Sequence, residues 1–189
     1  RGARLVSHCE PRQRITCPFH HWSYDLDGRL VGIPVAQAFD GLDRAAHGLL
    51  RVPVAEWHGM IFVIARPGDE TIDVEEFLGP AAPLFAALDL AGATPVHADT
   101  LRVSANWKLA LDSFCEPYHV PAAHPQSLAP ALVPWVAIYD RFGIHQRYAS
   151  PGAEVKDYAG KADTELPEPY YQGVHSLFPN TTFTVGRLV

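Results

Sequence analysis

Residues 106–125 read NWKLALDSFCEPYHVPAAHP, and this stretch holds the acidic and histidine residues on which the fold and chemistry of the chain depend. Its pattern predicts a helix over residues 106–119. At about 100° per residue, the side chains of Asp112, Glu116 and His119 fall on one helical face, opposite the large apolar side chains. The simplest interpretation of such a face is a solvated surface. The apolar and proline-rich residues that follow favour a functional site instead.

His119 and His124 are the candidate metal ligands of this stretch. On an unbroken helix, side chains five residues apart point about 140° away from each other, so they could not share a metal ion. Pro121 lies between them and is expected to end or distort the helix, which would bring the two rings together. Two neutral imidazoles suit iron, zinc or copper, and with one carboxylate they form the facial triad of non-haem Fe(II) sites.

A second stretch, residues 17–30, reads CPFHHWSYDLDGRL and combines a metal-binding pair with a hairpin. Cys17 and His20 form a C-x₂-H pair. Alone, this pair is typical of half a zinc site or of chance, because a four-ligand centre needs two more ligands. Asp27-Gly28 lies between two short runs of strand-forming residues and predicts a β-hairpin.

The remaining elements are expected to be short, because the chain contains 14 glycines and 17 prolines. A break at residues 67–70 predicts a domain boundary. Strands are expected before it at residues 15–17, 22–26, 29–33, 51–57 and 60–65, the last two as a hairpin. After it, the pattern predicts a helix at 73–90 interrupted by Gly79, Pro80 and Pro83, a strand at 94–104 and a strand-like run at 181–189.

The composition is that of a folded globular chain, with 48% hydrophobic and 19% charged residues among 189. The formal net charge of −6 argues against nucleic acid or an anionic membrane as a partner. No apolar run approaches the roughly 18 residues that span a bilayer.

Three cysteines do not make a secreted disulfide framework, so we expect a reducing, cytoplasmic location. We expect both ends to be internal to a longer protein, because the chain opens without an initiator methionine and closes on an uncapped strand-like run.

Together, the two stretches resemble Rieske non-haem iron oxygenase α subunits of the aromatic ring-hydroxylating dioxygenase type. Residues 17–30 resemble the second half of the Rieske iron–sulfur motif, and residues 106–125 resemble the mononuclear iron motif. The resemblance extends to residues 175–180, HSLFPN. Two independent motifs in the family's order make the match specific.

The resemblance implies a role for each candidate residue. Cys17 and His20 would be two of the four ligands of a [2Fe–2S] cluster. His119 and His124 would bind the catalytic iron, Fe(II) (Fe2+). Glu116 matches the family's bridging carboxylate, which would hydrogen-bond His119 and the cluster-ligating histidine of a neighbouring subunit in a ring-shaped homotrimer. Asp112 would either support the iron site or serve a structural hydrogen bond.

The resemblance also implies the fold and the activity. We expect an α+β chain: residues 1–68 as part of an all-β Rieske domain, and residues 69–189 as the first part of a helix-and-antiparallel-sheet, helix-grip-like catalytic domain. Electrons from NAD(P)H would arrive through a reductase or ferredoxin, and O₂ would be used to hydroxylate a small organic, aromatic substrate. A β subunit, and the choice between mono- and dioxygenation, stay open.

Two parts of the family pattern are absent from this sequence: the first Cys-x-His pair of the cluster motif and the carboxylate that is the third iron ligand. The 189-residue chain alone is therefore expected not to hold a stable cluster. The alternatives are an inactive piece of a longer protein and a metal- or ligand-binding module without redox chemistry, such as a structural zinc protein.

Overall fold

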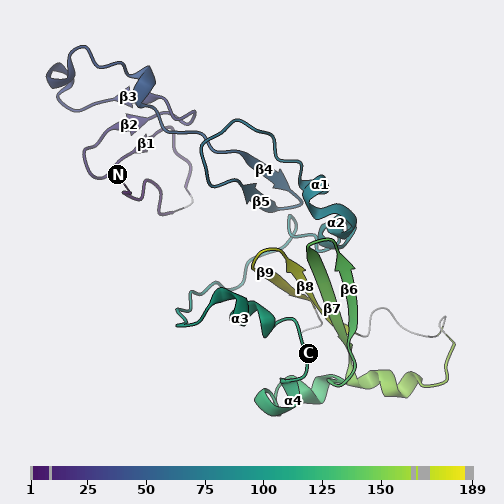
Figure 1. Cartoon of the computed structure of the whole chain (residues 1–189). Coiled ribbons are helices and arrows are strands. Elements are labelled where there is room, and N and C mark those ends of the chain that lie inside the picture. Colours follow the sequence, from purple (N-terminus) through teal and green to yellow (C-terminus); the bar gives the residue numbers. More distant parts are fainter. Residues whose placement is uncertain (1, 9, 163–164, 166–170, 186–189) are drawn as a thin grey trace. The chain divides into compact units, whose positions relative to one another are not determined.

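The chain forms two compact units, Arg1–Asp73 and Val74–Val189 (Figure 1). The structure is a computed structural model, and it describes residues 2–8, 10–162, 165 and 171–185. Short strands make up the first unit, and helices with an antiparallel sheet make up the second, so the predicted α+β class is confirmed. None of the described helices is long and apolar enough to cross a membrane.

The first unit is built from two small antiparallel sheets. One contains β1 (Ile15–Thr16), β2 (Ser23–Tyr24) and β3 (Leu30–Gly32), and the other contains β4 (Val54–Trp57) and β5 (Met60–Val63). Two 3₁₀ helices, η1 (Ala36–Phe39) and η2 (Ala45–His47), lie in the connection between the sheets. Both predicted hairpins are present. His58 and Gly59 have φ values of 46° and 81°, the left-handed pair that a tight two-residue hairpin requires.

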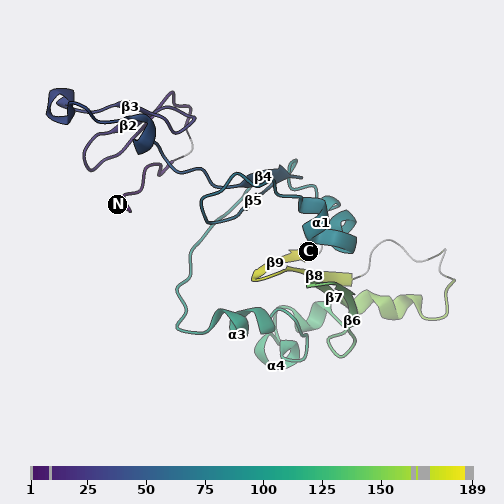
Figure 2. The ribbon, with the colours of Figure 1, turned by 45° about the horizontal axis from the view of Figure 1, so that its top comes forward.

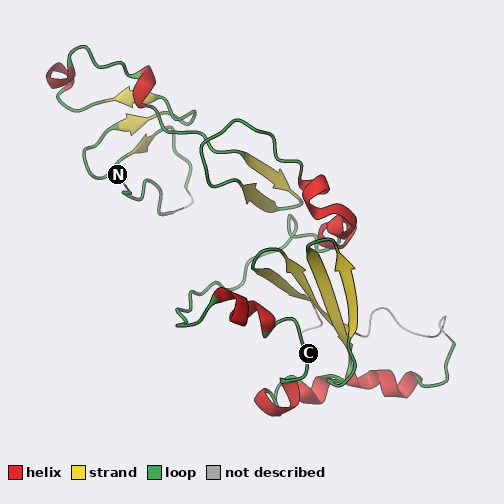
Figure 3. Cartoon of the chain, viewed as in Figure 1, coloured by secondary structure: helices red, strands yellow, loops and turns green. Residues whose placement is uncertain are grey.

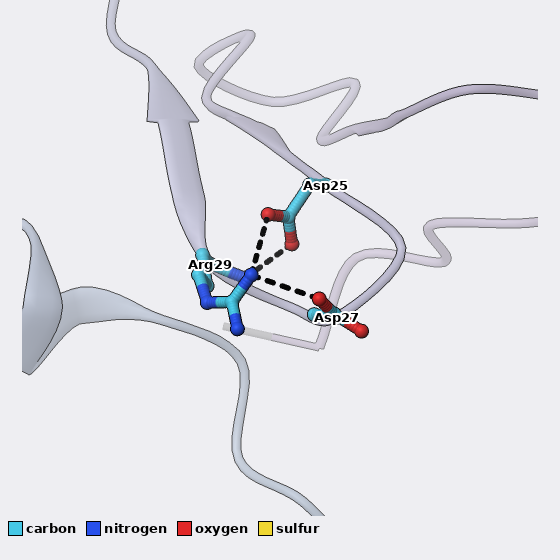
Figure 4. Close-up of polar contacts among 3 residues, drawn as sticks. All are labelled: Asp25, Asp27 and Arg29. Atoms are coloured by element: carbon cyan, nitrogen blue, oxygen red, sulfur yellow. Dashed lines mark hydrogen bonds and ion pairs between the residues drawn. The ribbon is translucent and has the colours of Figure 1, made fainter.

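The turn between β2 and β3 is held by the charged residues that the sequence places there (Figure 4). The Arg29 backbone N–H donates to Asp25 Oδ1 at 2.8 Å. The Arg29 guanidinium lies 2.8 Å from Asp27 Oδ2 and 3.7 Å from Asp25 Oδ2. Gly28 has a φ of 83°, and a Cβ there would lie 3.2 Å from Leu49 Cβ, so glycine satisfies both the backbone and the space.

The second unit contains one four-stranded antiparallel sheet with the strands in sequence order. Its strands are β6 (Ile138–Phe142), β7 (His145–Pro151), β8 (Tyr171–Leu177) and β9 (Thr181–Val185). The predicted run at 181–189 therefore contains a strand, and residues 186–189 lie outside the described part of the chain. Gly143, at φ 62°, is the first central residue of the two-residue turn between β6 and β7, where a hairpin favours glycine.

The first helices of this unit cover one face of the sheet (Figure 2). They are α1 (Val74–Leu78), η3 (Gly79–Ala81) and α2 (Ala82–Ala86), so the predicted helix at 73–90 is broken at Gly79. Phe85 is 2% exposed and packs edge-to-face on His175 and Phe183. On the opposite face of the sheet run α3 (Trp107–Asp112) and α4 (Val120–Ala123). Further 3₁₀ helices are η4 (Ala129–Ala131) and η5 (Ala153–Tyr158).

One predicted element is absent and another is shorter than expected (Figure 3). The strand expected at 94–104 is not observed; the described residues there form no ladder, and Val96 and Leu101 are 98% and 84% exposed. A strand-forming pattern gives a strand only where another strand supplies hydrogen-bond partners. The helix expected at 106–119 is present only over Trp107–Asp112, and it cannot resume before His119 because Pro117 disfavours helical backbone at Glu116.

His145 connects α1 to the sheet, and its replacement by Phe is expected to destabilise the second unit. The Phe178 N–H donates to His145 Nδ1 at 3.2 Å, so Nε2 carries the proton and donates to the Phe77 carbonyl at 2.9 Å. Because His145 is 2% exposed, His145→Phe leaves two backbone groups unpaired. We expect a loss of about 2–4 kcal/mol in the free energy of unfolding of the full-length protein. The exposed substitution His97→Phe is the control, and equal stabilities of the two variants would contradict this role.

His175 is expected to make the stability of the protein depend on pH. Burial, reinforced by the positive charge of Arg147, lowers the pKa of His175 below its usual 6.5, against a weaker opposing hydrogen bond to the Phe183 backbone. The unfolded chain therefore binds the proton first, and this contribution to stability is complete above pH 6.5 and is lost as the pH falls below that value. Urea unfolding between pH 7.5 and 5 should show a shallower pH dependence for His175→Phe than for wild type and His97→Phe. Identical slopes in all three proteins would contradict the assignment.

Candidate metal centre and cavity

The segment between α3 and α4 is shaped by prolines at 117, 121 and 125. Pro117 is buried and disfavours helical backbone at Glu116, in the turn that follows the end of α3 at Asp112. Pro121 lies in the first turn of α4, where its missing N–H would have had no helical partner. The expectation that Pro121 ends a helix is therefore wrong, since it begins one. Pro125 disfavours helical backbone at His124, the C-cap of α4, which has φ −128° and ψ 45°.

Glu116 and His119 form a local pair within this segment. Glu116 Oε1 contacts His119 Nδ1, and the His119 backbone N–H donates to Glu116 Oε2 at 3.1 Å. Desolvation is the largest effect on the Glu116 pKa and raises it, but the hydrogen bonds and charge of His119 together outweigh it and lower the pKa. Because Nδ1 is taken by the carboxylate, His119 Nε2 is the nitrogen available to a metal ion.

The rings of His119 and His124 lie side by side, with centroids 5.5 Å apart. The prediction that a break would bring them together is confirmed, although the break differs from the one expected. The two residues are the N-cap and C-cap of the four-residue helix α4, so neither ring follows the 140° offset of a continuous helix. Within the described residues, no group of three or more His, Cys, Asp or Glu side chains is arranged to hold a metal ion. The two imidazoles therefore stand as a pair, and they remain candidate metal ligands.

A cavity of about 440 Å³ adjoins both histidines and separates α4 from the sheet. The sheet contributes a row of paired residues, Tyr148, Val174 and Thr184, from three neighbouring strands. Further apolar lining comes from Phe114, Pro117, Val120, Leu128 and Leu132. The cavity is therefore mostly apolar, and its two imidazoles lie in one wall.

Sequence reasoning missed the contribution of β7 to this cavity. Tyr148 and Ser150 both line it, and their two-residue spacing puts them on one face of the strand. The run HQRYASP carries no apolar alternation, so the only available signal was the i, i+2 spacing of two hydroxyl residues. Cys115 is half-buried and accepts a hydrogen bond from Gln146 Nε2 at 2.9 Å.

Asp112 lies apart from the histidine pair. It is the last residue of α3, its side chain is exposed, and it lines a second cavity of about 590 Å³ together with Trp107 and Phe178. The predicted single helical face of Asp112, Glu116 and His119 is not formed, because the helix ends before Glu116. The expectation of core aromatics opposite that face is also wrong, since Trp107 and Tyr118 are 45% and 78% exposed.

Cys17 and His20 lie in the loop that joins β1 to β2. The loop is closed by a hydrogen bond of 2.9 Å from the Cys17 N–H to the Trp22 carbonyl, and both side chains are accessible. Backbone N–H groups of Phe19 and then His20 face the Cys17 sulfur and lower the pKa of the thiol. A stabilised thiolate beside an accessible imidazole is the donor set that an iron–sulfur cluster with mixed Cys and His ligation uses.

The geometry thus defines a chain with an accessible Cys/His loop in one unit and a pair of histidines beside an apolar cavity in the other. Comparison with known proteins identifies the family. The "Rieske [2Fe-2S] domain" family matches residues 1–54, and the "Ring hydroxylating alpha subunit (catalytic domain)" family matches residues 90–188. The chain belongs to this family of Rieske oxygenase α subunits, and membership assigns it two iron cofactors, a [2Fe–2S] cluster and a mononuclear Fe(II).

The named relatives are monooxygenases and dioxygenases. The chain is 33% identical over 141 residues to the glycine betaine monooxygenase oxygenase subunit of Pseudomonas aeruginosa, which covers 74% of this chain and 32% of that protein. It is 31% identical over 132 residues to the anthranilate 1,2-dioxygenase large subunit of Acinetobacter baylyi, which covers 66% of this chain and 28% of that protein. The chain therefore spans about a third of the length of these curated relatives.

Solved structures share the fold. A quaternary ammonium Rieske monooxygenase, described with carnitine oxidation and inter-subunit electron transfer, aligns with a TM-score of 0.75 at 21% identity over 98% of this chain and 49% of that one. Naphthalene 1,2-dioxygenase from Rhodococcus sp., bound to indole, aligns with a TM-score of 0.69 at 21% identity over 95% of this chain and 48% of that one.

The two described cysteines are expected to differ in reactivity. In the metal-free, reduced full-length protein, iodoacetamide at pH 7 should alkylate Cys17 faster than Cys115, because both side chains are partly buried but the lowered pKa of the Cys17 thiol favours the reactive thiolate. Peptide mass spectrometry over a time course measures both rates in one sample. Equal rates, or faster labelling of Cys115, would contradict the stabilisation of the Cys17 thiolate.

Proposed function

We propose that this chain is the electron-receiving and oxygen-activating part of a Rieske oxygenase α subunit that hydroxylates a small organic, aromatic substrate. Cys17 and His20 hold one side of the cluster, and His119 and His124 hold the catalytic iron. When bound, the cluster supplies a one-electron carrier and the Fe(II) supplies a site for O₂ activation. Residues outside this sequence provide the remaining ligands.

The Glu116–His119 pair is the observation that carries the proposal. The carboxylate fixes the tautomer and orientation of His119, so that Nε2 is directed away from Glu116 and is free for iron. The Glu116 side chain is 40% exposed, and a carboxylate has about four acceptor sites, so Glu116 can accept a further hydrogen bond from outside the unit. This supports the bridging role, in which Glu116 also accepts from His20 of a neighbouring subunit in a homotrimer.

The cavity supports the substrate class. Its lining is dominated by apolar side chains, which exclude water from the reacting centre and fit the body of an aromatic molecule. The two imidazoles lie in the cavity wall, so a bound substrate would lie next to the iron. Two relatives are named for aromatic substrates: the anthranilate 1,2-dioxygenase large subunit and the biphenyl dioxygenase subunit alpha of Metapseudomonas furukawaii, which is 33% identical over 133 residues.

The proposed partners follow from the same role. NAD(P)H supplies electrons through a ferredoxin or reductase, and the cysteine usage favours the cytoplasm. The boundary between the Rieske domain (residues 1–68) and the catalytic domain (residues 69–189) is placed at the Pro67-Gly68 break, close to the limit between the compact units at Asp73.

Replacing Glu116 tests the bridging role. In the full-length protein, Glu116→Ala should keep the cluster and most of the iron but slow the O₂-driven reoxidation of the chemically reduced cluster by about 10- to 100-fold. Metal analysis and stopped-flow absorbance measure the two effects, and the exposed substitution Glu75→Ala is the matched control. A wild-type reoxidation rate in Glu116→Ala at unchanged iron content would exclude the bridge, and stoichiometric zinc in a colourless protein would exclude the oxygenase.

Mixed oligomers separate an inter-subunit path from an intra-subunit one. Neither Glu116→Ala nor His20→Ala subunits alone should sustain electron delivery. In a co-expressed mixture, the intact Glu116 of one subunit can face the intact His20 of another, so delivery should be partly restored. A mixture as inactive as either variant would show that the path does not cross a subunit boundary.

A further inference from the structure

Tyr139 and Tyr148 form a pair of rings that leads from the cavity to the surface of the second unit. They lie directly opposite each other on β6 and β7, so both side chains belong to the cavity face of the sheet. Tyr148 lines the cavity beside His119 and His124, whereas Tyr139 is 57% exposed. The proposed function gives neither tyrosine a role.

The two rings are close neighbours. Their centroids lie 5.9 Å apart, and their planes are tilted by 39°. A cross-strand aromatic pair stabilises a sheet by packing, and that contribution needs only the rings. The hydroxyl groups add a second property, because phenols are among the side chains that lose one electron most easily. Since electron tunnelling slows steeply with distance, neighbouring rings exchange an electron faster than separated ones do.

Both tyrosines are neutral phenols at pH 7. Desolvation, followed by charged groups that include Glu116 and Cys115, raises the pKa of each. A phenol that loses an electron becomes a strong acid and releases its proton, so the product is a neutral tyrosyl radical. Tyr148 can give its electron and proton to an oxidant in the cavity, and the exposed Tyr139 can release its proton to solvent.

We propose that Tyr148 and Tyr139 form an electron-transfer path that carries oxidising equivalents from the cavity beside His119 and His124 to the protein surface when no substrate consumes them. This inference rests on the proposed function, in which iron bound by the two histidines is the site at which O₂ and peroxide react. An oxidant that stayed in the cavity would attack the side chains that line it. The path therefore protects the site between turnovers.

The chemistry balances with hydrogen peroxide, which is O₂ with two electrons and two protons added. Two further electrons and two protons reduce it to two molecules of water, and two passages through the path supply them. In each passage Tyr148 gives up an electron and its phenolic proton. Tyr139 then returns an electron to Tyr148, solvent returns the proton, and Tyr139 is left as a neutral radical after losing its own proton. An external thiol reduces that radical by hydrogen-atom transfer, and two thiyl radicals combine to a disulfide.

Hydrogen peroxide tests the path in the full-length protein without substrate. The iron and the cluster are oxidised first, so that neither supplies electrons, and a nitroso spin trap that adds to tyrosyl radicals replaces the thiol. We expect peptide mass spectrometry to find the adduct on Tyr139 in iron-loaded wild type and not in metal-free protein. Tyr148→Phe should lose this adduct although Tyr139 is intact. In Tyr139→Phe without the trap, electron paramagnetic resonance of rapidly frozen samples should show a tyrosyl radical that decays more slowly than in wild type.

Tyr158→Phe is the matched control. Tyr158 lies in η5 and is not among the described residues that line the cavity, and the Lys161 ammonium lies 4.3 Å from its ring centroid. This variant should keep the wild-type adduct on Tyr139. Each change from tyrosine to phenylalanine keeps the ring and its packing, so a pair that served only the stability of the sheet would leave the adduct unchanged in every variant that retains Tyr139.

The outcomes separate the path from the function on which it rests. Iron content and the O₂-driven reoxidation of the reduced cluster report on the oxygenase independently of the trap. An iron-loaded wild type without a Tyr139 adduct overturns the path alone. So does an adduct that survives in Tyr148→Phe or forms equally without metal, or a Tyr139→Phe radical that decays as fast as the wild-type one. A protein that binds no iron and forms no adduct overturns both.

Discussion

The contact between the Glu116 carboxylate and His119 Nδ1 is the interaction on which the proposed metal centre depends. It selects one tautomer of the imidazole and directs the other nitrogen outward, and it does so within three residues of sequence. Helix α3 has already ended at Asp112, and Pro117 disfavours a return to helical backbone at Glu116. The geometry of the centre is thus set by local chain stiffness, while the sheet and α4 enclose the cavity beside it.

The four-stranded sheet separates two chemical environments. One face packs against α1 and α2 through Phe85, His145 and His175, and there the histidines are core residues. The other face presents Tyr148, Ser150 and Thr184 to the cavity beside the paired histidines. Because side chains alternate across a strand, β7 contributes to both environments with consecutive residues. Histidines of the same chain therefore belong to the core on one face and are the proposed metal ligands beside the other.

The sequence predicts the features of this chain that depend on local spacing. The hairpins at Asp27-Gly28 and His58-Gly59, the break of the helix at Gly79 and the meeting of His119 with His124 all follow from turn chemistry or from proline. Features that depend on distant partners are missed. The run at 94–104 has the composition of a strand, but a ladder needs a neighbour that periodicity does not identify. Ser150 joins the cavity only because β7 pairs with β8, and no local pattern marks that pairing.

The short helix α4 has a consequence for how this family of sequences can vary. His119 and His124 are its two caps, so the four residues between them form a single helical turn with one ring at each end. One inserted or deleted residue in that turn would displace one cap relative to the other and separate the rings. The length of the interval between the two histidines is therefore constrained, and so is the proline within it that starts the turn.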